Sequence, residues 1–194
     1  MVSLTIAQDP DADRVLSQDP FALLVGMLLD QQFPMERAFA GPAKVLERFG
    51  TLDPRVVAEA DPEAFAELCA TPPAVHRYGR SMAGRIQALA AVVRDEYAAD
   101  ASAIWRDAPT GAELVRRLKA LPGFGEQKAK IFAALLGKQL GVRPEGWAEA
   151  CGAYAEPGSF RSVADVVDAD SLQKVRDFKK AAKAAAKTAA KSGG

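Results

Sequence analysis

The chain has 194 residues, of which 49% are hydrophobic, and its 25 lysines and arginines are balanced by 25 aspartates and glutamates. This size suits one domain or two small lobes sharing an interface, and no run approaches the roughly 18 apolar residues of a membrane span. No secretory signal pattern is present, and Cys69 and Cys151 are too few and too far apart for a disulfide framework or an iron–sulfur cluster. We expect an intracellular, reduced protein without a membrane partner.

Helical patterns dominate the chain, and no run of alternating β-type residues is present. Asp-Pro pairs mark helix starts at Asp19 and Asp61, because aspartate caps a helix and proline suits its first turn. We expect helices over about 20–29, 34–49 with an interruption at Gly41–Pro42, 62–68, 82–97, two around the segment described next, and one from 171 onward. The fold class predicted is all-α.

The segment Leu121–Ala129 reads Leu-Pro-Gly-Phe-Gly-Glu-Gln-Lys-Ala and joins two helical patterns over about residues 112–136. Thr110 and Glu113 have the spacing of a capping box at the start of the first helix. Gly123 can end that helix at positive φ, and Gly125 keeps side-chain bulk away from the start of the second helix. Backbone N–H groups and the positive end of a helix dipole then face outward together. This is an anion site, for which a nucleic-acid backbone is the natural ligand.

This segment resembles the helix-hairpin-helix element of the HhH-GPD superfamily of base excision DNA glycosylases, and the order of elements from about Pro20 to about Trp147 is similar as well. The likeness is greatest to a small actinobacterial-type group without an iron–sulfur cluster. It implies a two-lobed helical fold, a monomer that binds damaged or mismatched double-stranded DNA, and a place in the cytoplasm with the nucleoid. Family members also bind Na⁺ or K⁺ through hairpin carbonyls, which match Lys119, Leu121 and Phe124 here; no other cofactor is expected.

The resemblance also implies which side chains contact DNA. In the family a glutamine fills the space that a flipped base leaves, and the matching residues are Gln31 and Gln32, with Gln32 in the gap-filling position. A wedge residue enters the opposite strand, and Arg77 or Tyr78 occupies its place. Within and after the hairpin turn, the expected DNA contacts are Gly123, Gly125, Gln127, Lys128 and Lys130. The alternative for the two glutamines is a pair of exposed amides at a helix end.

Two departures from the family pattern concern the chemistry. Bifunctional members carry a nucleophilic lysine where this chain has Gln127, and Lys128 points about 100° away around a helix, so we expect no lyase activity and a water nucleophile. The register of the family's catalytic aspartate falls on Glu145, which is either the charge-stabilising residue or an ordinary acid near a helix start. Asp30, beside the glutamines, is the alternative acid.

The last 21 residues, 174–194, form a basic Ala/Lys-rich tail after a globular domain over 1–173. Seven basic residues and one acid between Lys174 and Lys191 give the tail a charge of +6 and leave −6 on the remainder. The tail is either a solvated terminus or a non-specific tether to DNA.

The sequence therefore favours a monofunctional DNA glycosylase that flips a damaged or mispaired base and hydrolyses its N-glycosidic bond in base excision repair. The alternative is a catalytically inactive protein of the same fold that binds DNA lesions or unusual DNA structures. A helical protein–protein module without a DNA role would require the hairpin match to be accidental.

Overall fold

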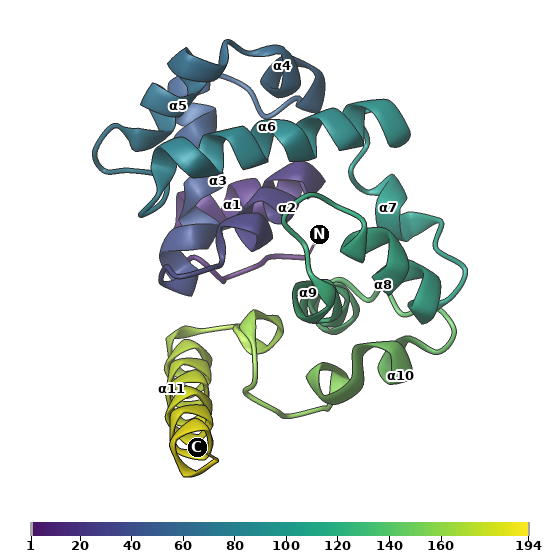
Figure 1. Ribbon diagram of the computed structural model, residues 1–194. Coiled ribbons are helices and arrows are strands. Elements are labelled where there is room, and N and C mark those ends of the chain that lie inside the picture. The colour runs from purple at the N-terminus through teal and green to yellow at the C-terminus, as the bar shows by residue number, and fades with distance from the viewer. Residues whose placement is uncertain (1, 194) are drawn as a thin grey trace.

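The computed structural model describes residues 2–193, and over this range the chain is helical with one isolated bridge, between Thr110 and Glu145, and no strand (Figure 1). This confirms the all-α prediction. The helices are α1 (Pro10–Gln18), α2 (Pro20–Leu29), α3 (Met35–Phe49), α4 (Pro54–Glu59), α5 (Pro62–Ala70), α6 (Gly79–Glu96), α7 (Ala103–Arg106), α8 (Gly111–Lys119), α9 (Glu126–Gln139), α10 (Trp147–Cys151) and α11 (Ala169–Ser192), with two 3₁₀ turns, η1 (Gly152–Ala155) and η2 (Val163–Asp165). None of these helices combines the length and apolarity needed to cross a membrane.

Helices α1 to α6 form one lobe around α2, whose residues Phe21–Leu29 are all buried. Helix α3 packs against α1 and α2, while α6 packs against α4 and α5 (Figure 1). Four of these helices start in the same way, with an aspartate side chain accepting backbone N–H groups and a proline at the first helical position: Asp9, Asp19, Asp53 and Asp61. Local sequence thus fixes where the helices begin, and burial of α2 fixes how they assemble.

Helix α3 runs without a break from Met35 to Phe49, so the expected interruption at Gly41–Pro42 is wrong. A proline inside a helix removes one hydrogen bond, which tertiary packing can outweigh. The packing is visible at Gly41, where an added Cβ would lie 2.5 Å from Leu29 Cδ1. The Gly-Pro pair therefore allows α3 to approach α2 closely rather than ending the helix.

Helices α7 to α10 form a second lobe around α9. Trp147 of α10 lies against α9, donating from Nε1 to the Ala133 carbonyl at 2.8 Å, and a Cβ on Gly137 would meet its ring at 2.1 Å. Only half of the expected capping box forms at the start of α8. Thr110 Oγ1 accepts the Glu113 N–H at 3.1 Å, whereas the Glu113 carboxylate binds Arg116 and Arg117 instead of reaching back.

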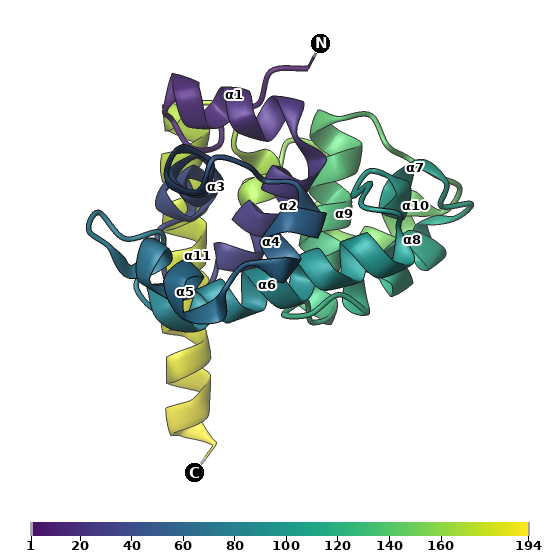
Figure 2. The same cartoon turned by 90° about the horizontal axis from the view of Figure 1, so that it is seen from above.

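Helix α11 begins at Ala169 with a capping box between Asp168 and Ser171. Leu172 and Val175 are buried, whereas the residues after Val175 are exposed. Figure 2 shows the far half of this helix extending beyond the rest of the molecule. The expected boundary between residues 173 and 174 thus falls inside one continuous helix, which starts on the body and continues away from it.

Candidate nucleic-acid interface

The turn between α8 and α9 spans Leu121–Gly125 and has the predicted backbone geometry. Gly123 has φ of +80°, a left-handed conformation that L side chains rarely adopt. Gly125 is extended and exposed, and a Cβ there would meet nothing within 4 Å. The first N–H bonded into α9 is that of Ala129, which donates to the Gly125 carbonyl at 2.9 Å. The preceding N–H groups of the first turn therefore lack helical partners at an open surface, as an anion site requires.

The turn is fixed to the end of α2. A Cβ on Gly123 would lie 2.4 Å from Leu28 Cδ1, so the turn touches this leucine directly. Lys128, in the first turn of α9, donates from Nζ to the carbonyls of Met27 at 2.9 Å and Leu28 at 3.1 Å. The lysine thereby adds a charged donor to the C-terminal end of α2, where a positive charge is favourable.

Beside this contact lies the buried carboxylate of Asp30, the C-cap residue of α2, whose side chain is 8% exposed. Burial raises the pKa of Asp30, while the charges of Lys179 and Lys128 act in the opposite direction. Burial lowers the pKa of Lys128 to about 8, with Asp30 as the opposing charge. The structure thus gathers an acid and two lysines from α2, α9 and α11.

The two glutamines after Asp30 differ in their surroundings. Gln31 donates from Nε2 to the Leu28 carbonyl at 2.9 Å and accepts from Arg85 Nη1 at 3.2 Å, so its side chain is held. Gln32 is exposed and has φ of +52°, an uncommon conformation for a residue with a Cβ. Of the pair, Gln32 presents its amide to solvent, as the gap-filling role would require.

A buried histidine connects these glutamines to the loop before α6. His76 is 1% exposed, and its Nδ1 accepts the Tyr78 N–H at 3.0 Å, so Nε2 carries the proton and donates to the Gln31 carbonyl at 2.9 Å. Burial lowers the pKa of His76 and favours this neutral form. Arg77 lies over the Tyr78 ring at 5.4 Å, and Tyr78 is 45% exposed. The expected wedge residues are thus exposed and directly follow His76, which binds Gln31.

The sequence also matches a known family. Residues 25–192 match the family model described as HhH-GPD superfamily base excision DNA repair protein. The chain belongs to this superfamily. No curated protein matches the sequence.

The side chains of the remaining predicted hairpin residues contact neighbouring side chains of the protein. Gln127, in the position of the lyase lysine, donates from Nε2 to the Tyr154 hydroxyl at 2.9 Å. Lys130 lies 3.6 Å from Glu126 Oε1 on the exposed side of α9. Both side chains lie at the surface next to the turn.

Glu145 lies away from this group. Its carbonyl accepts the Gly111 N–H at 2.7 Å, which places its backbone beside the first residue of α8, whereas the turn follows the last residue. A helix of that length, nine residues, spans about 13 Å. The structure therefore brings Asp30, Gln31, Gln32, Arg77, Tyr78 and the hairpin together, and leaves Glu145 at the opposite end of α8.

The carbonyls expected to bind a monovalent cation are largely without hydrogen-bond donors. Within residues 2–193 the Lys119 and Phe124 oxygens accept no hydrogen bond, and the Leu121 oxygen accepts one, from the Phe124 N–H at 3.1 Å. Free carbonyl lone pairs around one turn are the ligands that hard cations prefer. The two cysteines have a different character: Cys69 in α5 and Cys151 in α10 are buried, and burial raises the pKa of each thiol to about 11. Neither thiol is poised as a thiolate ligand.

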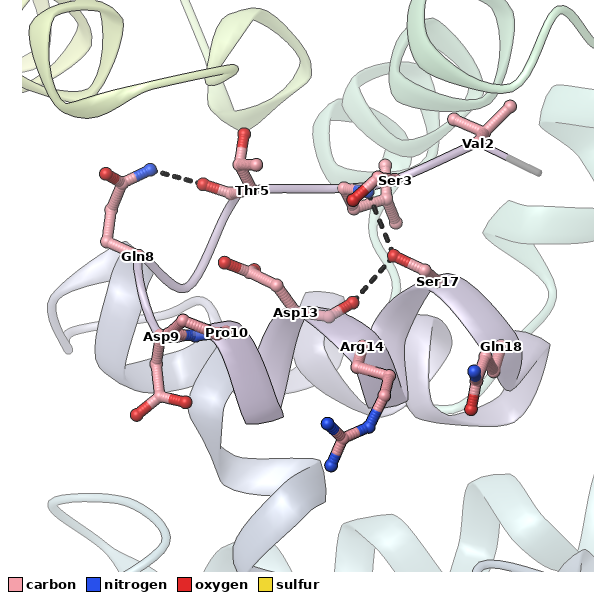
Figure 3. Close-up of a pocket in the computed structure, with 11 residues that line it drawn as sticks. Val2, Ser3, Thr5, Gln8, Asp9, Pro10, Asp13, Arg14, Ser17 and Gln18 are labelled. Carbon is pink, nitrogen blue, oxygen red and sulfur yellow. Dashed lines mark hydrogen bonds between the residues drawn. The ribbon is translucent and has the colours of Figure 1, made fainter.

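A separate cavity of about 510 Å³ lies under the N-terminal segment and α1 (Figure 3). Ser17 joins the two, because its Oγ accepts the Leu4 N–H at 2.9 Å and donates to the Asp13 carbonyl at 2.6 Å. The Asp13 carboxylate accepts the Ala7 N–H at 2.7 Å. These bonds hold the N-terminal segment on the lobe, so we assign this region a structural role.

The sequence analysis did not predict that His76 is buried and binds Gln31, or that Lys128 and Lys179 lie near Asp30. A lone histidine in a Pro-rich loop gives no local signal of burial. Lys128 and Lys179 are far from Asp30 in sequence, so only the packing of α9 and α11 on the first lobe brings their charges together.

Proposed function

We propose that the protein is a monofunctional DNA glycosylase that flips a damaged or mispaired base from a duplex and hydrolyses its N-glycosidic bond. The observation that carries this proposal is the position of Asp30. It is a buried carboxylate at the end of α2, directly before Gln31 and Gln32 and against the hairpin lysine Lys128. This position supports the proposal because residues that would prop open a base stack then lie next to a carboxylate that would do the chemistry.

In this mechanism the hairpin N–H groups hold a phosphate and Gln32 fills the space of the extruded base. Asp30 accepts a proton from the attacking water as the C1′–base bond breaks and the water oxygen bonds to C1′; the base leaves and takes up a proton. A pKa raised by burial makes Asp30 a stronger base than an exposed aspartate. Its negative charge also stabilises the oxocarbenium-like sugar, an effect for which preorganised electrostatics are well suited.

Lyase chemistry is not part of this mechanism. Gln127 replaces the nucleophilic lysine, and Lys128 uses its ammonium group to bind the carbonyls of α2 rather than to attack a sugar. We further propose that the protein acts as a monomer on double-stranded DNA, with Na⁺ or K⁺ at the hairpin carbonyls. Glu145 as the catalytic carboxylate stays a prediction, although its position at the far end of α8 favours Asp30.

A second candidate is a DNA-binding protein of the same fold without chemistry. The observation that favours it is the covering of Asp30: its side chain is only 8% exposed, and Lys179 of α11 lies 3.9 Å from Oδ2. Such a protein would recognise a lesion or a distorted duplex through the glutamines and the wedge loop and leave the base attached.

A screen of duplexes carrying uracil, oxidised guanine, alkylated purines, hypoxanthine and mismatches separates the two candidates. Strand breaks after alkali report abasic sites, and breaks without alkali report lyase activity. We expect alkali-dependent breaks that disappear in Asp30→Asn and persist in the matched variant Glu145→Gln. Loss of breaks only in Glu145→Gln would move the chemistry to that residue. Duplex binding without breaks on any substrate would favour the second candidate.

A further inference from the structure

A further basic region lies in the first lobe, beside His76. A cavity of about 510 Å³ opens between α3 and the loop before α6. We name it the basic pocket, and it is lined by Phe33, Arg37, Lys44, Pro73, Ala74, His76 and Arg77. Three cations and no acid line it.

The cations of the basic pocket lack counter-charges. Within residues 2–193, Arg37, Lys44 and Arg77 form no ion pair. Burial lowers the pKa of Lys44, and the charges of Arg48 and Arg37 lower it further. Like charges held together without acids raise the energy of the unbound protein, and a bound anion would remove this repulsion.

The wall of the pocket is already in place without a ligand. Arg48 donates to the carbonyls of Leu68 at 3.0 Å, Thr71 at 2.9 Å and Pro73 at 2.6 Å, which fixes the loop. Lys44 Nζ donates to the Ala74 carbonyl at 3.2 Å and keeps two N–H groups for another acceptor. Because the loop and the Lys44 side chain are already held in place, they lose little entropy when a ligand binds.

Two aromatic rings also line the basic pocket. The Phe33 ring lies against the His76 ring, with centroids 4.7 Å apart. Phe33 directly follows Gln32, and Arg77, one of the two wedge candidates, directly follows His76, so the pocket adjoins the proposed base-contacting residues. Cations beside an aromatic face are the combination with which proteins bind a nucleotide, through its phosphate and its base.

We propose that the basic pocket binds one nucleotide of the DNA outside the stretch held by the hairpin, with the phosphate on Arg37, Lys44 and Arg77 and the base against Phe33. This proposal rests on the proposed function in one respect only, that the surface around Gln32 binds DNA. It adds a second phosphate site, on the lobe that lacks the hairpin, and makes the two lobes grip the nucleic acid at separate points.

Titration with thymidine 5′-monophosphate, followed by NMR shifts of the backbone amides, tests the pocket without a duplex. We expect shifts around Phe33, Ala74 and Arg77, and much weaker binding of thymidine, which lacks the phosphate. Lys44→Met and Arg77→Gln should each weaken binding of the monophosphate by about tenfold, as expected when a charge-assisted hydrogen bond is removed. Arg77 is exposed, so its replacement leaves folding intact, and Arg106→Gln, which removes another exposed arginine, on α7, is the matched control.

The hairpin variant Gly125→Glu separates this proposal from the proposed function. It should lose duplex binding, because the added carboxylate faces the phosphate path, and keep monophosphate binding. Monophosphate binding by a protein that binds no duplex would refute the DNA-binding function and leave the pocket standing. Equal affinity for thymidine and its monophosphate, or undiminished binding in both Lys44→Met and Arg77→Gln, would overturn the pocket.

Discussion

Lys179 Nζ lies 3.9 Å from Oδ2 of Asp30, so the basic C-terminal helix reaches the buried acid at the end of α2. A second contact, between Arg176 and Glu36, fixes the same part of α11 to α3. The basic segment is therefore anchored beside the candidate site at its start. Its later lysines, at 183, 187 and 191, follow Lys179 at four-residue spacing and share one slowly turning helix face with it.

Replacing Lys179 with Met should raise the pKa of Asp30 further. The lysine charge stabilises the ionised carboxylate, and its loss leaves burial less opposed. Carbon-13 NMR titration of the Asp30 carboxyl group measures the change. Lys180→Met, which removes an adjacent charge, is the control and should leave the titration near that of the wild type. An unchanged Asp30 titration in Lys179→Met would show that the contact has no electrostatic effect.

Lys128→Met should lower the free energy of unfolding at pH 7 by about 1–3 kcal/mol, because the carbonyls of Met27 and Leu28 each lose a charged donor and Asp30 loses a counter-charge. The difference should grow as pH rises from about 8 toward 10.5. In that window the unfolded wild type binds more protons than the folded protein at Lys128, so folding gains stability with pH. Urea denaturation of both proteins across this range gives the comparison, and a constant difference would contradict the lowered pKa.

The hydrogen bonds of buried His76 with Gln31 and Tyr78 predict a loss of stability in mild acid. The pKa of His76 is lowered in the folded protein, so below its ordinary value of 6.5 the unfolded chain takes up a proton that the folded chain does not. Stability is therefore fully present above pH 6.5 and declines as pH falls toward the folded pKa. His76→Gln should be less stable at neutral pH and should lack this part of the decline. If the free energy of unfolding falls equally with pH in both proteins, His76 does not cause the decline.

The two glycines of the hairpin should respond differently to alanine. Gly123→Ala places a Cβ at positive φ and against Leu28, so we expect about 1–3 kcal/mol of lost stability. Gly125→Ala meets open space at a negative φ, so folding should be unaffected. Its methyl group nevertheless projects where a phosphate would approach. Fluorescence anisotropy should show weaker binding of this variant to all duplexes by a similar factor, and unchanged binding would disprove phosphate contact at the turn.

Deleting residues 180–194 should remove DNA affinity that does not depend on sequence. The deletion keeps Lys179 beside Asp30 and removes Lys180, Lys183, Lys187 and Lys191. For each phosphate that the protein no longer neutralises, the slope of log affinity against log salt should decrease in magnitude by about 0.9. The ranking of duplex substrates should remain the same, and a full-length salt slope in the truncated protein would exclude a role for the tail.

Sequence patterns were reliable where structure depends on neighbours in the chain. The hairpin was predictable because Gly123 and Gly125 meet local backbone requirements, and Asp-Pro pairs locate helix starts without knowledge of the fold. The helical interruption at Gly41–Pro42 was wrong because the packing of Gly41 on Leu29, which no local pattern contains, decides that segment.

The site was only partly predictable for the same reason. The end of α2 and the hairpin carry recognisable motifs, but the distance of Glu145 from the turn depends on how the chain after α9 returns to the start of α8. Similarly, Glu113 has the spacing of a capping residue, yet two arginines in the next turn bind its carboxylate. Competing partners in three dimensions decide these cases.

The contact of Gly123 with Leu28, together with the bonds from Lys128 to the end of α2, joins the turn that would hold the backbone to the glutamines that would probe the bases. The hairpin turn and the end of α2 therefore form one rigid unit. When this unit binds along a duplex, the DNA and not the protein has to deform. Mispaired or poorly stacked steps yield at the lowest cost in free energy. The mechanical weakness of a lesion would then select the site before any pocket reads the chemistry of the base.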